Sequence, residues 1–458
     1  MTDSGDSRRA IDGTEPEAEV GLLFSKLKPG PGMSAEEVAA DQRRRLHGAI
    51  IALVDAKSWE DVRVRSVARV AGVSTTTFYK HFANADQCFA SAFDAAMGGA
   101  LRRSASAGRG RREWRTALRS AVRALLTEFA EEPRSARVTL LDVFSAGPGA
   151  RRRIGHAVAE LEEVVASSLR TEPRPPPAPR RLVAGMAAGT IRVARQTTAA
   201  GRGAELPGLA DDLVEWMLCL PHAEIGSLLQ GAGASAADGR EPKPFPDTTQ
   251  RIVDGAVVDE RERLLRAAAK VATADGFAGL TTRNVRAEAG VSRRGFDATF
   301  DDLDQCFLAA VETIAEESVV RASAWAAGVE DWRIRICRAI LALCAQAARD
   351  QSLARVTFLE IFRPGRPGLL RRERLIGRAT TALLQAAPPG QRPSQVAAEA
   401  SVAAAWRIAH ADIAAGRARQ LPRIAPLLSY VVLAPIVGAE SAGEAIRSSG
   451  SINCGRTA

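Results

Sequence analysis

A short segment of the chain carries hydroxyl, phenol and cationic side chains at the spacing of one helix face. Phe78 and Phe82 lie four residues apart, so both would point into a small core if residues 75–81 are helical. The other positions are polar and would face outward: Thr75, Thr76, Tyr79 and Lys80. Hydroxyls and lysine can contact base edges or phosphates, and tyrosine can contact phosphate. The pattern predicts a short helix suited to the major groove of a DNA duplex.

The residues before this segment predict the turn that must position it. Gly72 permits a turn with positive φ after a short helix over 65–71. Ser74 is suited to cap the helix that follows, because its hydroxyl can accept from a free backbone N–H. Val67 and Val73 would complete the small core with the two phenylalanines.

The flanking sequence predicts two further helices. A helix with a continuous apolar face starts at Arg43-Arg44-Arg45 and breaks near Lys57-Ser58. Asn84 is suited to cap a longer helix after the motif. We therefore expect residues 43–97 to form four helices, the second and third joined by a tight turn.

The same motif occurs a second time, 218 residues later. Ala71-Gly72-Val73-Ser74 returns as Ala289-Gly290-Val291-Ser292 (290 − 72 = 218), and positions 66–93 and 284–311 share 12 identities in 28. Further pairs hold the register downstream: Trp114 with Trp332 at an offset of 218, and Arg192 with Arg407 at an offset of 215. A register held over this distance indicates duplication of a whole unit.

Residues 71–82 read Ala-Gly-Val-Ser-x-x-x-Phe-Tyr-x-His-Phe, which resembles the helix-turn-helix of the tetracycline-repressor (TetR) family of transcriptional regulators. In that family a small N-terminal helical module binds DNA. A larger C-terminal helical domain binds an inducer and dimerises through its last two long helices. The resemblance implies a repressor that a small-molecule ligand releases from double-stranded DNA.

The resemblance also implies which residues of the first copy contact DNA. Residues 74–80 would form the recognition helix, with Tyr79 and His81 on phosphates and Arg65 on the preceding helix. The implied set is Arg65, Ser74, Thr75, Thr76, Thr77, Tyr79, Lys80 and His81. Arg43, Arg44 and Arg45 open the module, so we expect phosphate contacts from them as well.

The second copy departs further from the family. Asp297 stands where the first copy has Tyr79, and Gly295 weakens the expected helix by about 1 kcal/mol relative to alanine. In both copies the usual lysine at the start of the fourth helix is missing, since Ala85 and Leu303 occupy that position. Arginine can nevertheless pair with guanine or phosphate. The candidate contacts are Arg283, Ser292, Arg293 and Arg294. The sequence leaves open whether this copy reads bases.

The chain is expected to be all-α and to contain two tandem TetR-like units. Abundant alanine and arginine favour helix, and the low aromatic content of 5% gives little support to strands. Pro-rich breaks at 171–179 and 387–393 interrupt the larger helical parts. The predicted segments are a disordered stretch 1–40, a first helix-turn-helix domain 41–100, a first regulatory domain 110–230, a linker 231–257, a second helix-turn-helix domain 258–320 and a second regulatory domain 328–440.

Composition agrees with a DNA partner without proving one. The net charge of +9 favours a polyanionic partner, although an arginine-rich proteome would give the same value. No secretory leader and no C-x-x-C pair are visible, so we expect a reducing cytoplasm. Cys88 and Cys306 occupy equivalent positions and are expected to be small buried hydrophobes. The apolar run Tyr430–Val437 is too short to cross a membrane, so no membrane partner is expected.

An enzyme is not expected. The five histidines are scattered, and the chain has no H-E-x-x-H, no G-x-S-x-G and no phosphate-binding G-K-[ST] loop. No cofactor and no metal site are predicted. The alternative function is a TetR-fold binding or scaffold protein that has lost operator recognition in one or both copies.

The two repeats are expected to pair with each other inside one chain. A flexible linker of about 28 residues has an r.m.s. span on the order of 30 Å, which keeps the repeats locally concentrated. The pairing surface would combine helices at about 180–201 and 207–229 with those at 395–416 and 422–438. A homodimer of chains is the rival arrangement. The ligand cannot be read, but four aromatic side chains could line its pocket: Trp114, Trp216, Trp332 and Phe144.

Overall fold

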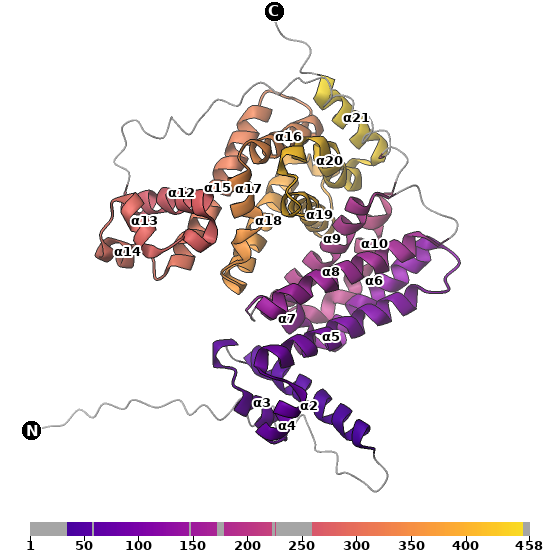
Figure 1. Ribbon diagram of the computed structural model, residues 1–458. Helices are drawn as coiled ribbons and strands as arrows, with labels where there is room; N and C mark the ends of the chain where they lie inside the picture. Colours follow the sequence, from indigo (N-terminus) through magenta and orange to yellow (C-terminus); the bar gives the residue numbers. More distant parts are fainter. Residues whose placement is uncertain are drawn as a thin grey trace, which may run out of the picture.

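The computed structural model describes residues 34–56, 59–145, 148–171, 178–221, 225 and 259–451 (Figure 1). All regular elements in these ranges are helices, so the all-α prediction is confirmed for the described part of the chain. The first unit contains α2 (Ala35–Ala56), η1 (Trp59–Asp61), α3 (Val64–Val70), α4 (Thr75–His81), α5 (Ala85–Gly108), α6 (Trp114–Glu131), α7 (Pro133–Leu140), η2 (Asp142–Phe144), α8 (Pro148–Leu169), α9 (Arg180–Ala199), η3 (Gly203–Leu209) and α10 (Ala210–Leu218). The second unit contains α12 (Glu260–Gly279), α13 (Thr282–Ala289), α14 (Arg293–Thr299), α15 (Leu303–Ala326), α16 (Trp332–Arg349), α17 (Gln351–Phe358), η5 (Glu360–Phe362), α18 (Arg366–Ala386), η6 (Pro389–Gln391), α19 (Gln395–Ala414), η7 (Ala418–Gln420), α20 (Leu421–Val437) and α21 (Ala439–Ser451).

The helices follow the register of the sequence repeat. From α3 to α8, each helix begins 218 residues before its counterpart among α13 to α18 (for example 332 − 114 = 218), and α9 precedes α19 by 215. We call α2–α4 the first head and α12–α14 the second head; Figure 1 shows them on different sides of the molecule. The predicted break at 57–58, most of the loop 171–179 and the linker 231–257 lie outside the described residues.

The first helix begins earlier than predicted. α2 starts at Ala35, so the end of the expected disordered segment 1–40 is helical, and residues 1–33 lie outside the described part. Ser34 and Glu37 explain the start, because they form a reciprocal cap. The Ser34 Oγ accepts the Glu37 N–H at 3.2 Å, and the Glu37 Oε2 accepts the Ser34 N–H at 2.7 Å.

Other boundaries also differ from the expectation. α5 and α15 run past the predicted head boundaries at 100 and 320, and α21 extends the second unit beyond 440 to pack on α16 and α20. The sequence predicts the break at 171–179 in the first larger helical part, yet α6 already ends at Glu131. Pro133 opens α7 as its first residue, where the missing N–H of proline costs no hydrogen bond.

One helix contradicts the expectation that no apolar run reaches membrane-spanning length. Ala418–Val437 is long and apolar enough by length and composition, with a mean hydropathy of 1.4. In the structure, 61% of this window is buried, and α20 packs against α16, α19 and α21. It therefore has the surroundings of a core helix.

The two units meet along α9 and α19. The predicted surface also included 207–229, of which part lies outside the described residues, and 422–438. Gly189 makes the close approach possible, since a Cβ there would lie 2.4 Å from the Trp216 ring and 3.0 Å from the Ala400 carbonyl oxygen. The Trp216 Nε1–H donates to the Ser401 Oγ at 2.9 Å across the interface. α20 packs within its own unit, so the second unit contributes mainly α19 and α18 to this surface.

Equivalent residues of the two units meet at this interface. Phe144 stacks on Phe362, its counterpart at an offset of 218, with ring centroids 6.1 Å apart. The Arg195 guanidinium lies 5.5 Å from the Phe144 ring, and His410, its counterpart at an offset of 215, lies 6.2 Å from the Phe362 ring. Positions that correspond in the sequence repeat thus lie close together at this contact.

A buried ion cluster crosses the same interface. The Glu373 carboxylate of α18 lies 3.1 Å from Arg195 and 2.5 Å from Arg372, and it also contacts Arg192. Burial raises the pKa of Glu373, but the three arginines outweigh burial and lower it to about 2. At the edge of the interface, Arg407 pairs with the half-buried Glu162 at 2.7 Å. The interface thus joins apolar packing to charge pairs that involve both units.

Candidate nucleic-acid interface

The turn between α3 and α4 has the predicted geometry. Gly72 adopts φ 64°, a conformation that side-chain-bearing residues rarely adopt. The Ser74 Oγ accepts the Thr77 N–H at 3.0 Å and caps α4, and the Asn84 Oδ1 accepts the Gln87 N–H at 2.9 Å and caps α5. These local predictions are confirmed. The turn therefore sets the direction of α4 relative to α3.

The small core of the first head contains the predicted residues. Val67 and Phe78 are fully buried, Phe82 is nearly so, and Val73 packs at the edge. The Phe78 and Phe82 rings have centroids 5.9 Å apart. The apolar side of α4 is thus fixed against α2 and α3, which leaves its polar side in solvent.

The polar side of α4 is exposed over most of its length. The exposed candidates in this head are Arg43, Arg44, Arg65, Ser74, Thr75, Thr76, Tyr79 and Lys80. Tyr79 has 59% of its surface exposed, although its ring contacts Phe78 edge-on at 5.6 Å. The hydroxyl of a tyrosine this exposed is accessible to a partner molecule such as DNA. Thr77 is half-buried, and its hydroxyl lies 2.9 Å from that of Ser74.

Arg45 has partners within the head instead of a free guanidinium. It donates to the Ala71 carbonyl at 2.8 Å and to the Gly72 carbonyl at 3.4 Å, and its Nε donates to Asp41 at 2.9 Å. Only 12% of its side chain is exposed. It thereby links α2 to the turn before α4, a role that the sequence did not reveal. Arg44 is 71% exposed and pairs with the same Asp41 at 2.5 Å.

His81 is also engaged within the head. Its Nε2 lies 2.9 Å from the Gln42 Oε1, and the ring is half-buried. Burial lowers the pKa of His81, and Arg43 and Lys80 lower it further. The ring is therefore neutral at pH 7 and fastens the end of α4 to α2.

The second head repeats the turn but changes the exposed face. Gly290 has φ 64°, and the Ser292 Oγ accepts the Gly295 N–H at 3.0 Å. Arg283, Arg293 and Arg294 are exposed. The Arg293 Nε lies 3.6 Å from the Asp297 carboxylate, one helical turn away. Part of the positive charge of α14 is thus balanced on the helix itself.

Glu260 brings a second carboxylate to α14. A Cβ on Gly295 would lie 2.6 Å from the Glu260 Oε2 and 2.8 Å from the Val291 Cγ1. Glycine at this position therefore accommodates neighbours of α12 and the turn, besides weakening the helix. The counterpart of Glu260 in the first head is the neutral Gln42 (260 − 218 = 42).

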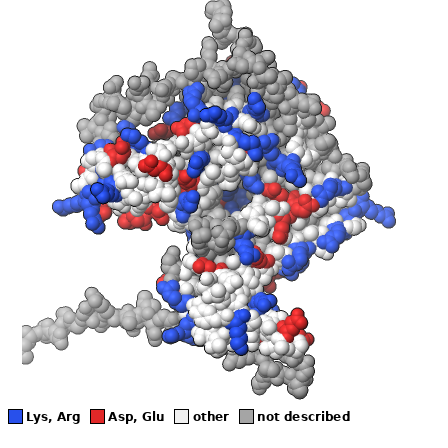
Figure 2. All heavy atoms as spheres, viewed as in Figure 1, with Lys and Arg blue, Asp and Glu red and all other residues white. Residues whose placement is uncertain are grey.

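The two heads carry similar net charges. Residues 35–81 contain eight basic and six acidic side chains, a net charge of +2, and residues 260–299 contain eight basic and five acidic ones, a net charge of +3. Figure 2 shows mainly basic side chains with one acidic cluster on the visible face of the first head, at the bottom, and both signs intermixed on the second, at the left. Net charge alone therefore does not distinguish the heads. They differ in where the charges lie, since Asp297 and Glu260 place carboxylates on and beside α14.

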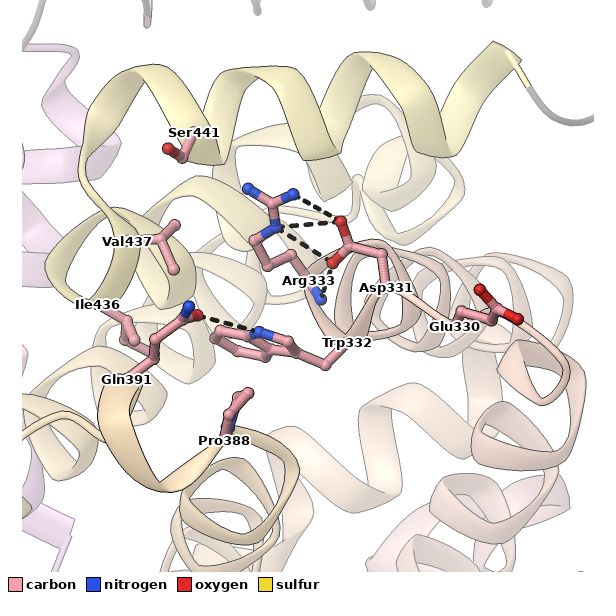
Figure 3. A pocket seen from close by; sticks show the side chains of 9 residues that line it. All are labelled: Glu330, Asp331, Trp332, Arg333, Pro388, Gln391, Ile436, Val437 and Ser441. Atoms are coloured by element: carbon pink, nitrogen blue, oxygen red, sulfur yellow. Dashed lines mark hydrogen bonds and ion pairs between the residues drawn. The ribbon is translucent and has the colours of Figure 1, made fainter.

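The predicted pocket aromatics belong mainly to cores. Trp114, Trp216, Trp332 and Phe144 are all buried. Trp332 also lines an open groove of about 590 Å³ between α16, α20 and α21, where its Nε1–H donates to the Gln391 Oε1 at 3.2 Å (Figure 3). Arg333 and Asp331 pair at 2.6 Å beside it. This groove lies on the second unit, away from both heads.

The cysteines of the described residues are thiols. Cys88 and Cys306 are fully buried, as predicted, and burial raises the pKa of each to about 12. Within the described ranges, no group of three or more His, Cys, Asp or Glu side chains could hold a metal ion.

Comparisons with known proteins give distant likenesses in structure alone. No family model and no curated protein matches the chain. Among solved structures it is similar to FadR from Bacillus subtilis in complex with stearoyl-CoA (17% identical, covering 38% of this chain and 97% of that chain, TM-score 0.35). It is also similar to the fatty acid degradation regulator FadR from Bacillus halodurans (17%, 42% and 97%, TM-score 0.35). A TetR family transcription regulator from Marinobacter aquaeolei VT8 is a third (17%, 39% and 97%, TM-score 0.32).

Proposed function

We propose that this chain is a sequence-specific DNA-binding regulator of transcription, built from two tandem TetR-like units. The observation that carries the proposal is the exposed polar face of α4. That face stands on a turn fixed by Gly72 and capped by Ser74, and its head has a net charge of +2 over residues 35–81. Repression relieved by a small molecule is the mode that the resemblance implies.

The candidate residues of the first head are proposed to have three roles: contact with bases, contact with phosphates, and positioning of α4. Thr75, Thr76 and Lys80 are proposed to contact base edges, because they are exposed along one side of α4. Phosphate contacts are proposed for Tyr79, Arg43, Arg44 and Arg65. Ser74, Thr77, Arg45 and His81 are proposed to hold α4 in place, since each already has a partner within the head.

The second head is proposed to contribute less to DNA affinity. Asp297 and Glu260 place carboxylates on and beside α14, and Arg293 is partly neutralised by Asp297. The alternative function, binding without operator recognition, is therefore favoured for this head alone. Arg283, Ser292 and Arg294 remain the candidates for any contact it makes.

The units are proposed to pair within one chain. Trp216 donates to Ser401, whose counterpart in the first unit is Met186 (401 − 215 = 186), and a thioether accepts hydrogen bonds poorly. Pairing two first units would also lose Glu373, which balances Arg192 and Arg195. Light scattering should give a mass near 48.6 kDa. Twice that mass at micromolar concentration would contradict a monomeric pseudo-dimer.

Selection from random duplexes tests the function. The full chain should enrich one asymmetric sequence, and its affinity should fall steeply with salt as counterions are released. Lys80→Ala or Tyr79→Ala should weaken binding by roughly tenfold, the effect of about 1.4 kcal/mol. Asp297→Ala, at the position equivalent to Tyr79, is the matched control and should not weaken it. Enrichment of no sequence would refute the regulator proposal.

A further inference from the structure

Asp142 stands between the first head and the second unit. The residue belongs to η2, and only 2% of it is exposed. Its Oδ2 lies 3.6 Å from the Arg137 Nε of α7, and its Oδ1 lies 2.9 Å from the Arg366 Nη1 of α18. The Arg137 Nε also lies 3.0 Å from the Asp55 carboxylate at the end of α2. Four alternating charges thus run from the first head to the second unit.

The second unit has the same fastening but lacks the link across. Glu360, the counterpart of Asp142 (360 − 142 = 218), accepts the Phe277 N–H of the second head at 2.8 Å. Arg355, the counterpart of Arg137, lies 3.4 Å from it. The position of Arg366 is occupied in the first unit by Pro148, which carries no charge. An acid at this position therefore fastens each head. Among the ion pairs of the described side chains, Asp142 has a cationic partner in the other unit and Glu360 has one within its own.

The backbone next to Arg366 packs tightly against η2, whereas Arg137 borders an open hollow. Gly365 has φ 72°, and a Cβ there would lie 2.7 Å from the Phe144 carbonyl oxygen, so the start of α18 is pressed against η2. A hollow of about 230 Å³ lies between the end of α2 in the first head and helices α6, α7 and α9 of the first unit. Asp55 and Arg137 line this hollow. Of the four charges, Arg366 therefore lies beside the tightly packed end of the row, and Asp55 and Arg137 lie beside the end with free space.

We propose that Asp142 is a positioning residue through which the second unit sets the position of the first head, an inference that rests on the proposed function of that head. Arg366 and Arg137 compete for one buried carboxylate. When the contact with Arg366 is lost, Asp142 draws Arg137 away from Asp55, and the end of α2 is released. The second unit would then control DNA binding by the first head without touching DNA.

The test uses the full chain and two readouts. Arg366→Gln should raise hydrogen exchange at least threefold in the last turn of α2 and in α3, without raising it in α12 and α13. The affinity of the selected duplex should change at least threefold. Arg366→Lys should restore part of both effects. Arg378→Gln is the matched control, because Arg378 lies on the same helix and pairs with Glu312 within the second unit.

A double-mutant cycle with Arg137→Gln separates coupling from general loosening. If the chain of charges is continuous, the two substitutions together should change exchange in α2 by less than the product of their separate effects. Equal exchange for Arg366→Gln and Arg378→Gln would overturn the proposal. Faster exchange confined to the first head, in a chain that selects no DNA sequence, would support the coupling while refuting the DNA-binding function.

Discussion

The buried carboxylate of Glu373 should be the most sensitive charge of the interface. Its side chain is 10% exposed and is shared by Arg192, Arg195 and Arg372, which are themselves buried. Glu373→Gln keeps the shape of the side chain and removes its charge. Three buried guanidinium groups would then lose the anion that balances them, and such groups are costly to leave unpaired.

Two estimates give the loss of stability expected for Glu373→Gln. The pKa of Glu373 falls from 4.5 to about 2, which corresponds to about 3 kcal/mol, since one pKa unit is worth about 1.4 kcal/mol. Breaking a buried pair by removing one partner typically costs about 3–5 kcal/mol. Because the folded-state pKa is lowered, this stabilisation is complete above pH 4.5 and is lost as the pH falls from 4.5 towards 2.

Urea unfolding followed by tryptophan fluorescence measures the effect, because Trp216 is buried in the same interface. Glu373→Gln should lower the free energy of the first unfolding step by about 3 kcal/mol at pH 7 and flatten its pH dependence below 4.5. Glu162→Gln is the matched control. It removes a partner of Arg407 whose side chain is 27% exposed, against 10% for Glu373, and should cost about 1 kcal/mol. Equal effects of the two substitutions would refute this reasoning.

Three smaller predictions concern the first head. Arg45→Met should destabilise it by about 1–3 kcal/mol and speed hydrogen exchange in α3 and α4, because two carbonyls lose a charged donor; the exposed Arg44→Met should not. Gly72→Ala should lower its stability by about 1 kcal/mol in thermal unfolding, since φ is 64°, and an unchanged melting temperature would argue against strain. Burial, with help from Arg43, lowers the pKa of His47 to about 4. Stability should therefore decline as the pH falls from 6.5 towards 4, and less so in His47→Gln when both are titrated side by side.

Features set by neighbours in the chain could be predicted from the sequence. The positive φ of Gly72, the caps at Ser74 and Asn84 and the buried pair Phe78 and Phe82 depend on residues within four positions of one another. The start of α2 follows the same rules, because Ser-x-x-Glu at 34–37 forms its cap, whereas the apolar pattern alone predicts a start at Arg43. Local geometry needs no knowledge of the rest of the fold.

Features set by distant residues could not be predicted. Arg45 reaches a carbonyl 26 residues away, so a basic run at a helix start looked like a phosphate contact. The repeat itself gave no hint of Glu373, because the equivalent position in the first unit is Gly155 (373 − 218 = 155). Burial of α20 depends in the same way on α16, which ends 72 residues before α20 begins (421 − 349 = 72). Contacts between residues far apart in the sequence depend on how the helices pack in three dimensions.

The difference between Glu373 and its counterpart Gly155 also has a consequence for the evolution of the interface. In a homodimer every substitution appears on both sides of the two-fold axis, so a new buried acid would need two sets of arginines at once. Here a single codon alters one side only, and Arg192 and Arg195 of the other unit already provide the complement. In the proposed pairing of two units within one chain, each half can specialise independently, and the two halves are always made in equal amounts.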